Sequence, residues 1–316
     1  MKKILTIIIP SYNISRYIDS IMPHYLCEPL FDKVNLLFID DGATDNTVEL
    51  LKPFSKKYPN YIAIINKPNG GHGSVINYGV NIAKTKYFKV VDGDDWVDPK
   101  ELLRLCEYLD NCDDDLIVSD FMYEFSDRSS LSLGFDEKRQ FKYKIHLHNA
   151  TFKTGIWKAN NIKVREKVFY EDSQYVLFPL EFIKKISYFK ATIYHYRCDN
   201  PNQSVNPMQQ LKHKDDYIIV TKDLCDYLMR IWPNQQIDQK IKEYILDNTS
   251  RILFGGYEIC SSKGLSFSES VKLCKEMDSI FKKYPLVFKQ MKKRYKKYRY
   301  LSFMNYLGLR IYLKNN

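Results

Sequence analysis

The feature that most constrains the fold is a repeated alternation of short apolar runs with helix-like segments. Runs of strand length, rich in Ile, Val, Leu and Phe, occur at residues 4–10, 34–40, 61–66, 87–92 and 115–125. The segments between them have the residue spacing and start signals of helices, at residues 11–26, 41–58, 73–84 and 99–112. Because continuous apolar strands are typical of parallel sheets buried on both faces, the alternation predicts an α/β fold with a mainly parallel sheet flanked by helices.

Polar residues follow the predicted strands at their carboxyl ends. The first strand ends in Pro10-Ser11-Tyr12-Asn13, the second in Asp40-Asp41-Gly42 and the fourth in Asp92-Gly93-Asp94-Asp95. The third leads into NKPNGGHGS, residues 66–74, whose glycines permit close backbone approach to a ligand. Each motif alone is more often a simple turn. Their conjunction, in this order, predicts one ligand site at the edge where the strand ends meet.

Four carboxylates are crowded into residues 89–98, KVVDGDDWVD. Asp92, Asp94, Asp95 and Asp98 would repel one another if all were ionised and close together, so a positive partner is expected. Asp98 precedes Pro99 and is predicted to be a helix N-cap, so neither it nor Asp95 need be a ligand.

Four segments in this order resemble the family 2 glycosyltransferases with a GT-A fold. They are IIIPSYNISRYIDSI, LLFIDDGATDNT, NKPNGGHGSVINYGVNIAKTKYFKVVDGDDWVDP and, later, YEDSQY. The resemblance covers about residues 4–200. It implies a GT-A, Rossmann-like domain that transfers a sugar from a nucleotide-sugar donor, usually UDP-linked, with inversion at the anomeric carbon. It also implies a need for Mn²⁺ or Mg²⁺.

The resemblance implies that Asp92 and Asp94 form the DxD motif of the metal and donor site. Asp94 is then the expected direct metal ligand, and Asp92 is expected to contact the donor ribose or a metal-bound water. A divalent cation that bridges these carboxylates to a diphosphate would offset their repulsion. For Asp95 two roles are open, one in supporting the metal ligands and one that is purely structural.

The resemblance also implies which residues bind the nucleotide. Tyr12 is expected to stack on the uracil, with packing against the next helix as the alternative, and Asp41 is expected to accept a hydrogen bond from uracil N3–H. His72 has two open roles, one in binding a phosphate or sugar hydroxyl and one in holding the turn. The other residues expected along the donor site are Pro10, Lys67, Asn69, Gly70, Gly71 and Gly93.

Inversion requires a general base that takes the proton of the acceptor hydroxyl. The resemblance places it in the pair Glu171-Asp172, with Asp172 as the base and Glu171 orienting the acceptor or supporting the base. Alone, such a pair is better explained by its favourable charge at a helix N-terminus, and it is the upstream motifs that favour the catalytic role. Trp157, upstream, is a candidate stacking platform for a sugar ring, although a single Trp is more often a core residue.

The segment YHYRCDNPNQS, residues 194–204, resembles the late loop that closes over the donor in this family. Arg197 is expected to neutralise the diphosphate, with a surface carboxylate as the alternative partner. His195 is expected to contact a phosphate or the metal.

The character of the sequence changes after Pro207, where successive amphipathic helices are predicted, one of them with a capping box at Ser266 and Glu269. The predicted organisation is a GT-A catalytic domain at residues 1–206 and a helical, C-terminally basic region at residues 207–316. Residues 282–316 contain eleven Lys or Arg and no Asp or Glu, whereas the whole chain has 48 basic and 38 acidic residues.

This charge distribution and the rest of the composition indicate the cellular setting. A basic end on a nearly neutral body favours a local anionic partner, such as a membrane surface, over a nucleic acid. The first apolar run is short for a signal peptide and ends at Pro10, and the seven cysteines form no CxxC pair. We therefore expect a cytoplasmic protein with reduced thiols. Two roles are open for residues 282–316: attachment to the inner face of the plasma membrane, and a solvated helical face whose apolar side packs on residues 207–280.

The predicted function is the transfer of a hexosyl or N-acetylhexosaminyl group from a UDP-sugar to a hydroxyl of a glycan or lipid-linked acceptor. A role in bacterial cell-surface polysaccharide or teichoic-acid synthesis is expected. Two alternatives are open: a non-catalytic nucleotide-sugar-binding or scaffold relative, and a nucleotidyltransferase. The sequence does not predict the sugar, the acceptor or the oligomeric state.

Overall fold

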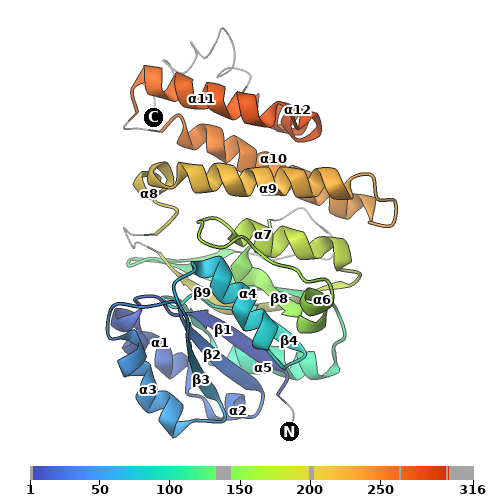
Figure 1. Cartoon of the computed structure of the whole chain (residues 1–316). Helices are drawn as coiled ribbons and strands as arrows, with labels where there is room; N and C mark the ends of the chain where they lie inside the picture. The colour runs from blue at the N-terminus through green and yellow to red at the C-terminus, as the bar shows by residue number, and fades with distance from the viewer. Residues whose placement is uncertain (1–2, 133–143, 199–202, 263–264, 297, 299–316) are drawn as a thin grey trace. The chain divides into compact units, whose positions relative to one another are not determined.

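The computed structural model describes residues 3–132, 144–198, 203–262, 265–296 and 298 (Figure 1). The chain divides into two compact units, residues 1–200 and 201–316. The first unit contains all the strands described, and the described part of the second is helical.

One half of the sheet in the first unit is parallel. In the order β3-β2-β1-β4, it consists of Ile62–Asn66, Val34–Asp40, Leu5–Pro10 and Tyr87–Val90. Ile8 of β1 pairs with Leu37 on one side and Val90 on the other. Residues Leu5–Ile9 are all buried, as the continuous apolar run predicted. The parallel arrangement brings the carboxyl ends of these strands to one edge.

The other half of the sheet is mixed, so the first four strands are wholly parallel and the rest combine parallel and antiparallel pairs. The order continues through β8, β6, β9 and β5, with β7 beside β6, at Ala150–Lys153, Leu116–Glu124, Ile186–Arg197, Trp96–Val97 and Ser129–Ser132. β8 is antiparallel to both of its neighbours, and β6 is parallel to β9. The chain reverses direction between β6 and β8, which makes the antiparallel pairing possible.

Successive residues of β1 point to opposite faces of the sheet, and those from Leu5 to Ile9 are all apolar or buried. Both faces are therefore covered by helices. Ile7 and Ile9 belong to one core cluster with residues of α1 and α5. Ile8 faces α4, where a Cβ on Gly79 would lie 2.7 Å from its Cγ2. The helical segments of this unit are η1 Ser15–Tyr17, α1 Ile18–Tyr25, α2 Glu28–Phe31, α3 Thr47–Lys57, α4 His72–Ile82, α5 Pro99–Asn111, η3 Leu147–Asn149, α6 Thr154–Ala159, α7 Asp172–Leu177 and η4 Phe178–Phe182.

Trp157 of α6 lies in an aromatic part of the core. Its ring is 5.3 Å from the rings of Phe88 and Tyr175 and 5.6 Å from that of Phe152, and the residue is only 1% exposed. Of the two readings of Trp157, the core residue is therefore confirmed and the sugar platform is excluded. An indole surrounded by three aromatic rings has no face left for a ligand.

The second unit consists of α8 Pro207–Lys212, α9 Lys214–Ile231, α10 Gln239–Ile259, α11 Phe267–Phe281 and α12 Pro285–Arg294. The amphipathic helices predicted here are confirmed, and so is the capping box, in which the Ser266 side chain accepts from the Glu269 amide and the Glu269 carboxylate accepts from the Ser266 amide. These reciprocal bonds satisfy donors that a helix start otherwise leaves unpaired.

The basic helix α12 packs against α10. Val287, Phe288 and Met291 are buried, and Arg294 pairs with Asp247 of α10. The apolar side of α12 is therefore occupied within its own unit, while its lysines remain on the surface. Residues 299–316 of the basic segment lie outside the described residues. In the part of the chain that the structure describes, no helix is both long and apolar enough to cross a membrane.

Candidate active site

The strand ends that the sequence singled out meet at one edge of the sheet. Pro10 pairs with Ile39, next to Asp40, and β4 ends beside them at Val90. Gly93 is buried, and a Cβ on it would lie 2.4 Å from the carbonyl oxygen of Pro10. Only glycine fits there without displacing the backbone. Gly93 thus brings the carboxylates after β4 against the end of β1.

The glycine turn after β3 is held by Asp41. The Asp41 carboxylate accepts hydrogen bonds from the amides of Gly70, at 2.9 Å, and Gly71, at 2.8 Å, and pairs with the Lys67 ammonium. The left-handed φ of 80° at Gly71 suits glycine. Asp41 is only 3% exposed, so its observed contacts position the turn. Its predicted recognition of uracil stays a prediction.

Lys67 is also occupied in holding the turn. Besides Asp41, its ammonium donates to the carbonyl of Pro68 and the hydroxyl of Ser74, both at 2.8 Å. An ammonium group has three protons to donate. The predicted contact of Lys67 with the diphosphate would therefore require one of these bonds to be exchanged.

Tyr12 lies at the open side of this edge. Its side chain is 49% exposed, unlike that of Ser11, which is buried. The following residue, Asn13, has a left-handed φ of 55°, and its side-chain oxygen accepts from the amide of Thr44. The loop after β1 is thus tied to the loop after β2, and an aromatic face is presented to solvent. This arrangement suits a residue that stacks on a base. Asn69, predicted along the same site, is exposed on the turn that follows Lys67.

His72, the first residue of α4, bridges two carboxylates that are far apart in the sequence. Its Nδ1 is 2.6 Å from Oε1 of Glu171, and its Nε2 is 2.9 Å from Oδ1 of Asp92. Burial would lower the pKa of His72, but its hydrogen bonds to Asp92 and Glu171 raise that pKa well above its usual range. A protonated His72 can therefore pair with both carboxylates, offset one of their two negative charges and connect the predicted donor and acceptor sides.

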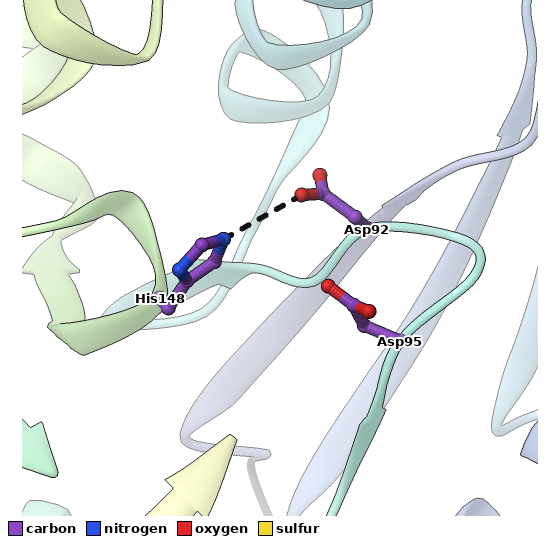
Figure 2. A group of neighbouring side chains, drawn as sticks. All are labelled: Asp92, Asp95 and His148. Carbon is purple, nitrogen blue, oxygen red and sulfur yellow. Dashed lines mark ion pairs between the residues drawn. The ribbon is translucent and has the colours of Figure 1, made fainter. Parts of the chain in front are cut away.

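Asp92, Asp95 and His148 form a compact group at the same edge (Figure 2). One potential ligand atom from each lies within 4.8 Å of the others, and Nε2 of His148 is 3.8 Å from Oδ2 of Asp92. Burial would raise the pKa of Asp92, but the imidazoles of His148 and His72 hold that pKa below its usual range. The imidazolium of His72 therefore supplies part of the positive charge that was expected from a metal.

Both carboxylate oxygens of Asp95 accept hydrogen bonds from β9. One of its oxygens accepts from the hydroxyl of Tyr194 at 2.5 Å and the other from the amide of Arg197 at 2.7 Å. The residue is 1% exposed. Burial and the charges of Asp94 and Asp92 raise its pKa well above the usual range. Of the two roles left open, these contacts favour the one in which Asp95 fastens β9 to the loop after β4.

Asp94 is a less satisfied carboxylate. Within the described residues, no other residue donates a hydrogen bond to it, and burial together with the charge of Asp92 raises its pKa. The buried Nδ1 of His148 also has no hydrogen-bond partner in the described part of the chain. Oxygen ligands in excess of local positive charge are what a hard divalent cation prefers. The residues present therefore fit such an ion.

The two β9 residues predicted at the donor site have different surroundings. Arg197 donates from Nε to the carbonyl of Asp94 at 2.8 Å, and its guanidinium lies 4.8 Å from the ring centre of Trp96. His195 also stacks on Trp96, with 5.5 Å between the ring centres, and its Nδ1 is 2.6 Å from Oε1 of Glu124. The structure thus brings Arg197 to the DxD turn, whereas His195 is paired with a carboxylate of β6.

The two carboxylates predicted to include the general base, Glu171 and Asp172, lie at the start of α7. Glu171 is 4% exposed and is engaged by His72. Asp172 is half-buried, and its Oδ1 accepts from the amide of the adjacent Ser173. Asp172 is therefore the more accessible of the two carboxylates. This difference favours the predicted assignment of base and supporting residue.

Gly73 allows the segment before α7 to approach the start of α4. A Cβ at this position would lie 2.1 Å from the carbonyl oxygen of Arg165 and 3.1 Å from Cγ of Glu171. Both neighbours would have to move, and one of them is backbone. The contact between Gly73 and residues 165–171 is therefore intolerant of any side chain.

We expect Gly73→Ala to lower the free energy of unfolding by about 1–3 kcal/mol, the usual cost of overpacking. Gly155→Ala in α6 is the matched control, because a Cβ there meets nothing within 4 Å. The control should be neutral or stabilising by up to about 1 kcal/mol, since alanine favours helix. Urea unfolding monitored by circular dichroism measures both. Equal stability of the two variants would contradict the close approach.

Sequence reasoning missed His148 and Tyr194. His148 is outside every motif, and it reaches Asp92 only because η3 follows the reversal between β6 and β8. Tyr194 was part of the quoted YHYR segment, and a strand there puts alternate residues on one face. That alternation separates Tyr194 from His195, but it gives no signal for its bond to Asp95, 99 residues away.

The comparisons with known proteins agree with this geometry. A family model described as "Glycosyl transferase family 2" matches residues 6–169, just over half of the chain. An uncharacterized glycosyltransferase of Mycoplasma pneumoniae, the MG025 homolog, is 36% identical over 123 residues, which are 38% of this chain and 40% of that protein. The minor teichoic acid biosynthesis protein GgaB of Bacillus subtilis is 25% identical over 239 residues, 71% of this chain and 26% of GgaB. The matched regions thus span less than half of either relative.

A solved structure shares the fold over almost the whole chain. It is residues 1–349 of TarS from S. aureus in complex with UDP-GlcNAc, with a TM-score of 0.63 and 16% sequence identity. The alignment covers 95% of this chain and 92% of that one. At this identity the likeness shows the fold, which is GT-A.

Proposed function

The chain belongs to glycosyl transferase family 2, and from this premise we propose that it transfers a sugar from a UDP-sugar to a hydroxyl group, with inversion. The observation that carries the proposal is the hydrogen-bonded chain from Asp92 through His72 to Glu171, the neighbour of Asp172 in the sequence. It joins the carboxylates at the strand ends to an accessible carboxylate across the site. An inverting transferase needs these two elements, one for the leaving diphosphate and one for the acceptor proton.

On the donor side, Tyr12 stacks on the uracil and Asp41 keeps the glycine turn in place beneath the ribose and phosphates. The guanidinium of Arg197, beside Asp94, supplies positive charge to the diphosphate. Asp94 and Asp92 would hold a divalent cation, Mn²⁺ or Mg²⁺. When bound, that ion neutralises negative charge on the UDP leaving group. The UDP-GlcNAc bound to TarS, a protein of the same fold, supports a UDP-linked donor.

On the acceptor side, Asp172 takes the proton from the attacking hydroxyl on the face of the sugar opposite UDP. Glu171 cannot easily do so, because it is buried and held by His72. The protonated His72 keeps Asp92 and Glu171 together despite their like charges. The acceptor is a cell-surface glycan or a lipid-linked precursor of one, which is supported by the likeness to a protein named for teichoic acid biosynthesis.

The experiment is to incubate the purified protein with UDP-glucose, UDP-galactose, UDP-GlcNAc and UDP-GalNAc and to measure UDP release in Mn²⁺, Mg²⁺ and EDTA. UDP should be released from one of these four donors faster than from the others, and EDTA should abolish this release. A scaffold relative would bind UDP without turnover in any condition. A nucleotidyltransferase would not release UDP from these donors. It would instead release pyrophosphate when it is given a nucleoside triphosphate together with a sugar phosphate.

We further propose that the protein works at the cytoplasmic face of an anionic membrane. The support is electrostatic, since the apolar side of α12 is buried whereas Lys289, Lys293 and Lys296 are exposed. Each cation near an anionic surface contributes about 1 kcal/mol. Changing these three lysines to glutamine should therefore weaken binding to phosphatidylglycerol vesicles by about 100-fold in low salt.

Sedimentation with vesicles measures this binding. The matched control is the same change at Lys52, Lys56 and Lys57 of α3, which are also exposed. The control should sediment like the unchanged protein. Equal loss in both variants, or no binding by the unchanged protein in low salt, would exclude attachment through α12.

A further inference from the structure

The imidazole of His148 faces the carboxylate of Asp92 across a short gap (Figure 2). Its Nε2 is 3.8 Å from Oδ2 of Asp92, which is longer than an N–H···O hydrogen bond of about 2.7–3.2 Å. The other oxygen of that carboxylate, Oδ1, is 2.9 Å from Nε2 of His72. The two oxygens of Asp92 therefore have different surroundings: one is paired with His72, and the other faces His148 across the gap.

The gap has the size that a single metal ion requires. Ligand atoms lie about 2.0–2.2 Å from Mg²⁺ and from small transition-metal ions, so two of them on one ion are about 3–4.4 Å apart. The separation of 3.8 Å between His148 and Asp92 is within this range. A ligand atom of Asp95 also lies within 4.8 Å of one from each of the other two. A cation here would therefore contact a nitrogen and an oxygen, beside a further carboxyl group.

The ring of His148 is held in position by its neighbours. The ring centres of Tyr194 and Tyr196 are 4.6 Å and 4.7 Å from that of His148, and the ring centre of Phe121 is 5.0 Å away. The buried ammonium of Lys89 donates to the carbonyl oxygen of His148 at 2.6 Å. A side chain that is already fixed loses little conformational entropy when it binds a ligand. The imidazole is therefore preorganised to face Asp92.

Packing among these rings does not explain why the residue is a histidine. Its Nδ1 is buried and has no hydrogen-bond partner in the part of the chain that the structure describes. An unpaired buried polar atom costs free energy, and a phenyl ring would pack among the same neighbours without that cost. A neutral imidazole with its proton on Nδ1 presents the lone pair of Nε2 to the gap. A role for Nε2 as a metal ligand explains the choice of residue.

We propose that Nε2 of His148 is a ligand of the divalent cation and makes the site favour transition-metal ions such as Mn²⁺ over Mg²⁺. Imidazole nitrogen binds first-row transition ions, whereas Mg²⁺ is held through oxygen. The nitrogen therefore adds affinity for Mn²⁺ and little for Mg²⁺. This inference rests on the proposed function in one respect, because it assumes that a cation binds at the carboxylates after β4.

The test is pulsed EPR of Mn²⁺ bound to the full chain with UDP, because a coordinated imidazole gives a nitrogen coupling that oxygen ligands do not. The unchanged protein should show this coupling. His148→Phe keeps a ring among the same neighbours and should lose the coupling. His148→Gln can place an amide oxygen near the position of Nε2, so it should bind Mn²⁺ without the coupling. It also answers the question if circular dichroism shows that His148→Phe does not fold.

The matched control is His146→Asn in the same short helical segment. His146 is the N-cap of η3, and asparagine is a good N-cap, so this variant should keep both the fold of the segment and the nitrogen coupling. Free Mn²⁺ in the same samples gives the Mn²⁺ affinity, and competition gives that for Mg²⁺. His148→Phe should weaken Mn²⁺ binding at least about 10-fold and Mg²⁺ binding less than about 3-fold.

Three results would overturn the proposal: bound Mn²⁺ without a nitrogen coupling in the unchanged protein, a coupling that survives in His148→Phe, or Mn²⁺ and Mg²⁺ affinities that change by the same factor in that variant. UDP release from UDP-sugars in Mn²⁺, measured on the same preparations, separates this proposal from the proposed function. Normal release by an unchanged protein that lacks the coupling rejects the His148 ligand alone. Absence of release from every UDP-sugar by the unchanged protein rejects the proposed function.

Discussion

Asp94→Asn should reduce sugar transfer by at least about 100-fold while leaving the fold intact. Asparagine has nearly the size of aspartate but removes the negative charge that a divalent cation needs. Changes around a metal or at a group that stabilises developing charge commonly cost about 10- to 1,000-fold. The pKa of Asp94 is raised by burial and by Asp92, so the folded protein without metal disfavours its charged form. The variant should therefore be as stable as the unchanged protein, or more stable.

Thermal unfolding with and without UDP and Mn²⁺ distinguishes loss of metal binding from loss of fold. The unchanged protein should unfold at a higher temperature when both are present, because a ligand that binds only the folded state stabilises it. Asp94→Asn should lose most of that increase. Asp98→Asn is the matched control in the same motif. Asp98 caps α5 by accepting from the amides of Lys100 and Glu101, and asparagine caps a helix about as well. Normal turnover of Asp94→Asn in Mn²⁺ would show that Asp94 is not the metal ligand.

Asp172→Asn should slow transfer by about 10²–10⁴-fold, the usual contribution of a general base, without weakening UDP binding. The asparagine keeps the hydrogen bond from the amide of Ser173, so the start of α7 should be preserved. Steady-state transfer and UDP binding by calorimetry are measured on the same preparation. Loss of UDP binding, with transfer reduced only in proportion, would instead place Asp172 at the donor.

Glu171→Gln should be the milder change, since Glu171 is buried against His72 and acts through its position. Glutamine can still accept from His72, although it no longer carries the charge that stabilises the imidazolium. If Glu171→Gln slows transfer more than Asp172→Asn at equal UDP binding, the base is Glu171.

The local signals in the sequence were sufficient for the elements and their order. Continuous apolar runs of strand length predicted the strands β1, β2, β3, β4 and β6, because such runs are typical of the strands of a parallel sheet covered by helices. The helix start at Asp98 and the capping box at Ser266 were predicted because capping depends on residues within one turn. The family was recognisable because its motifs are short and follow the strands in order.

The tertiary structure decided how these elements share charge and surface. His72 reaches Glu171 across 99 positions, and the amide of Arg197 reaches Asp95 across 102. No local pattern predicts which of several carboxylates will be buried beside which histidine. The structure placed His148 next to Asp92, buried Trp157 among aromatic rings and left Phe169 exposed. Trp157 and Phe169 are both aromatic residues near the predicted base in the sequence. Which of them lies in the core and which faces solvent depends on how α6 and residues 164–171 pack on the sheet. These contacts join residues that are far apart in the sequence, so a local sequence pattern does not predict them.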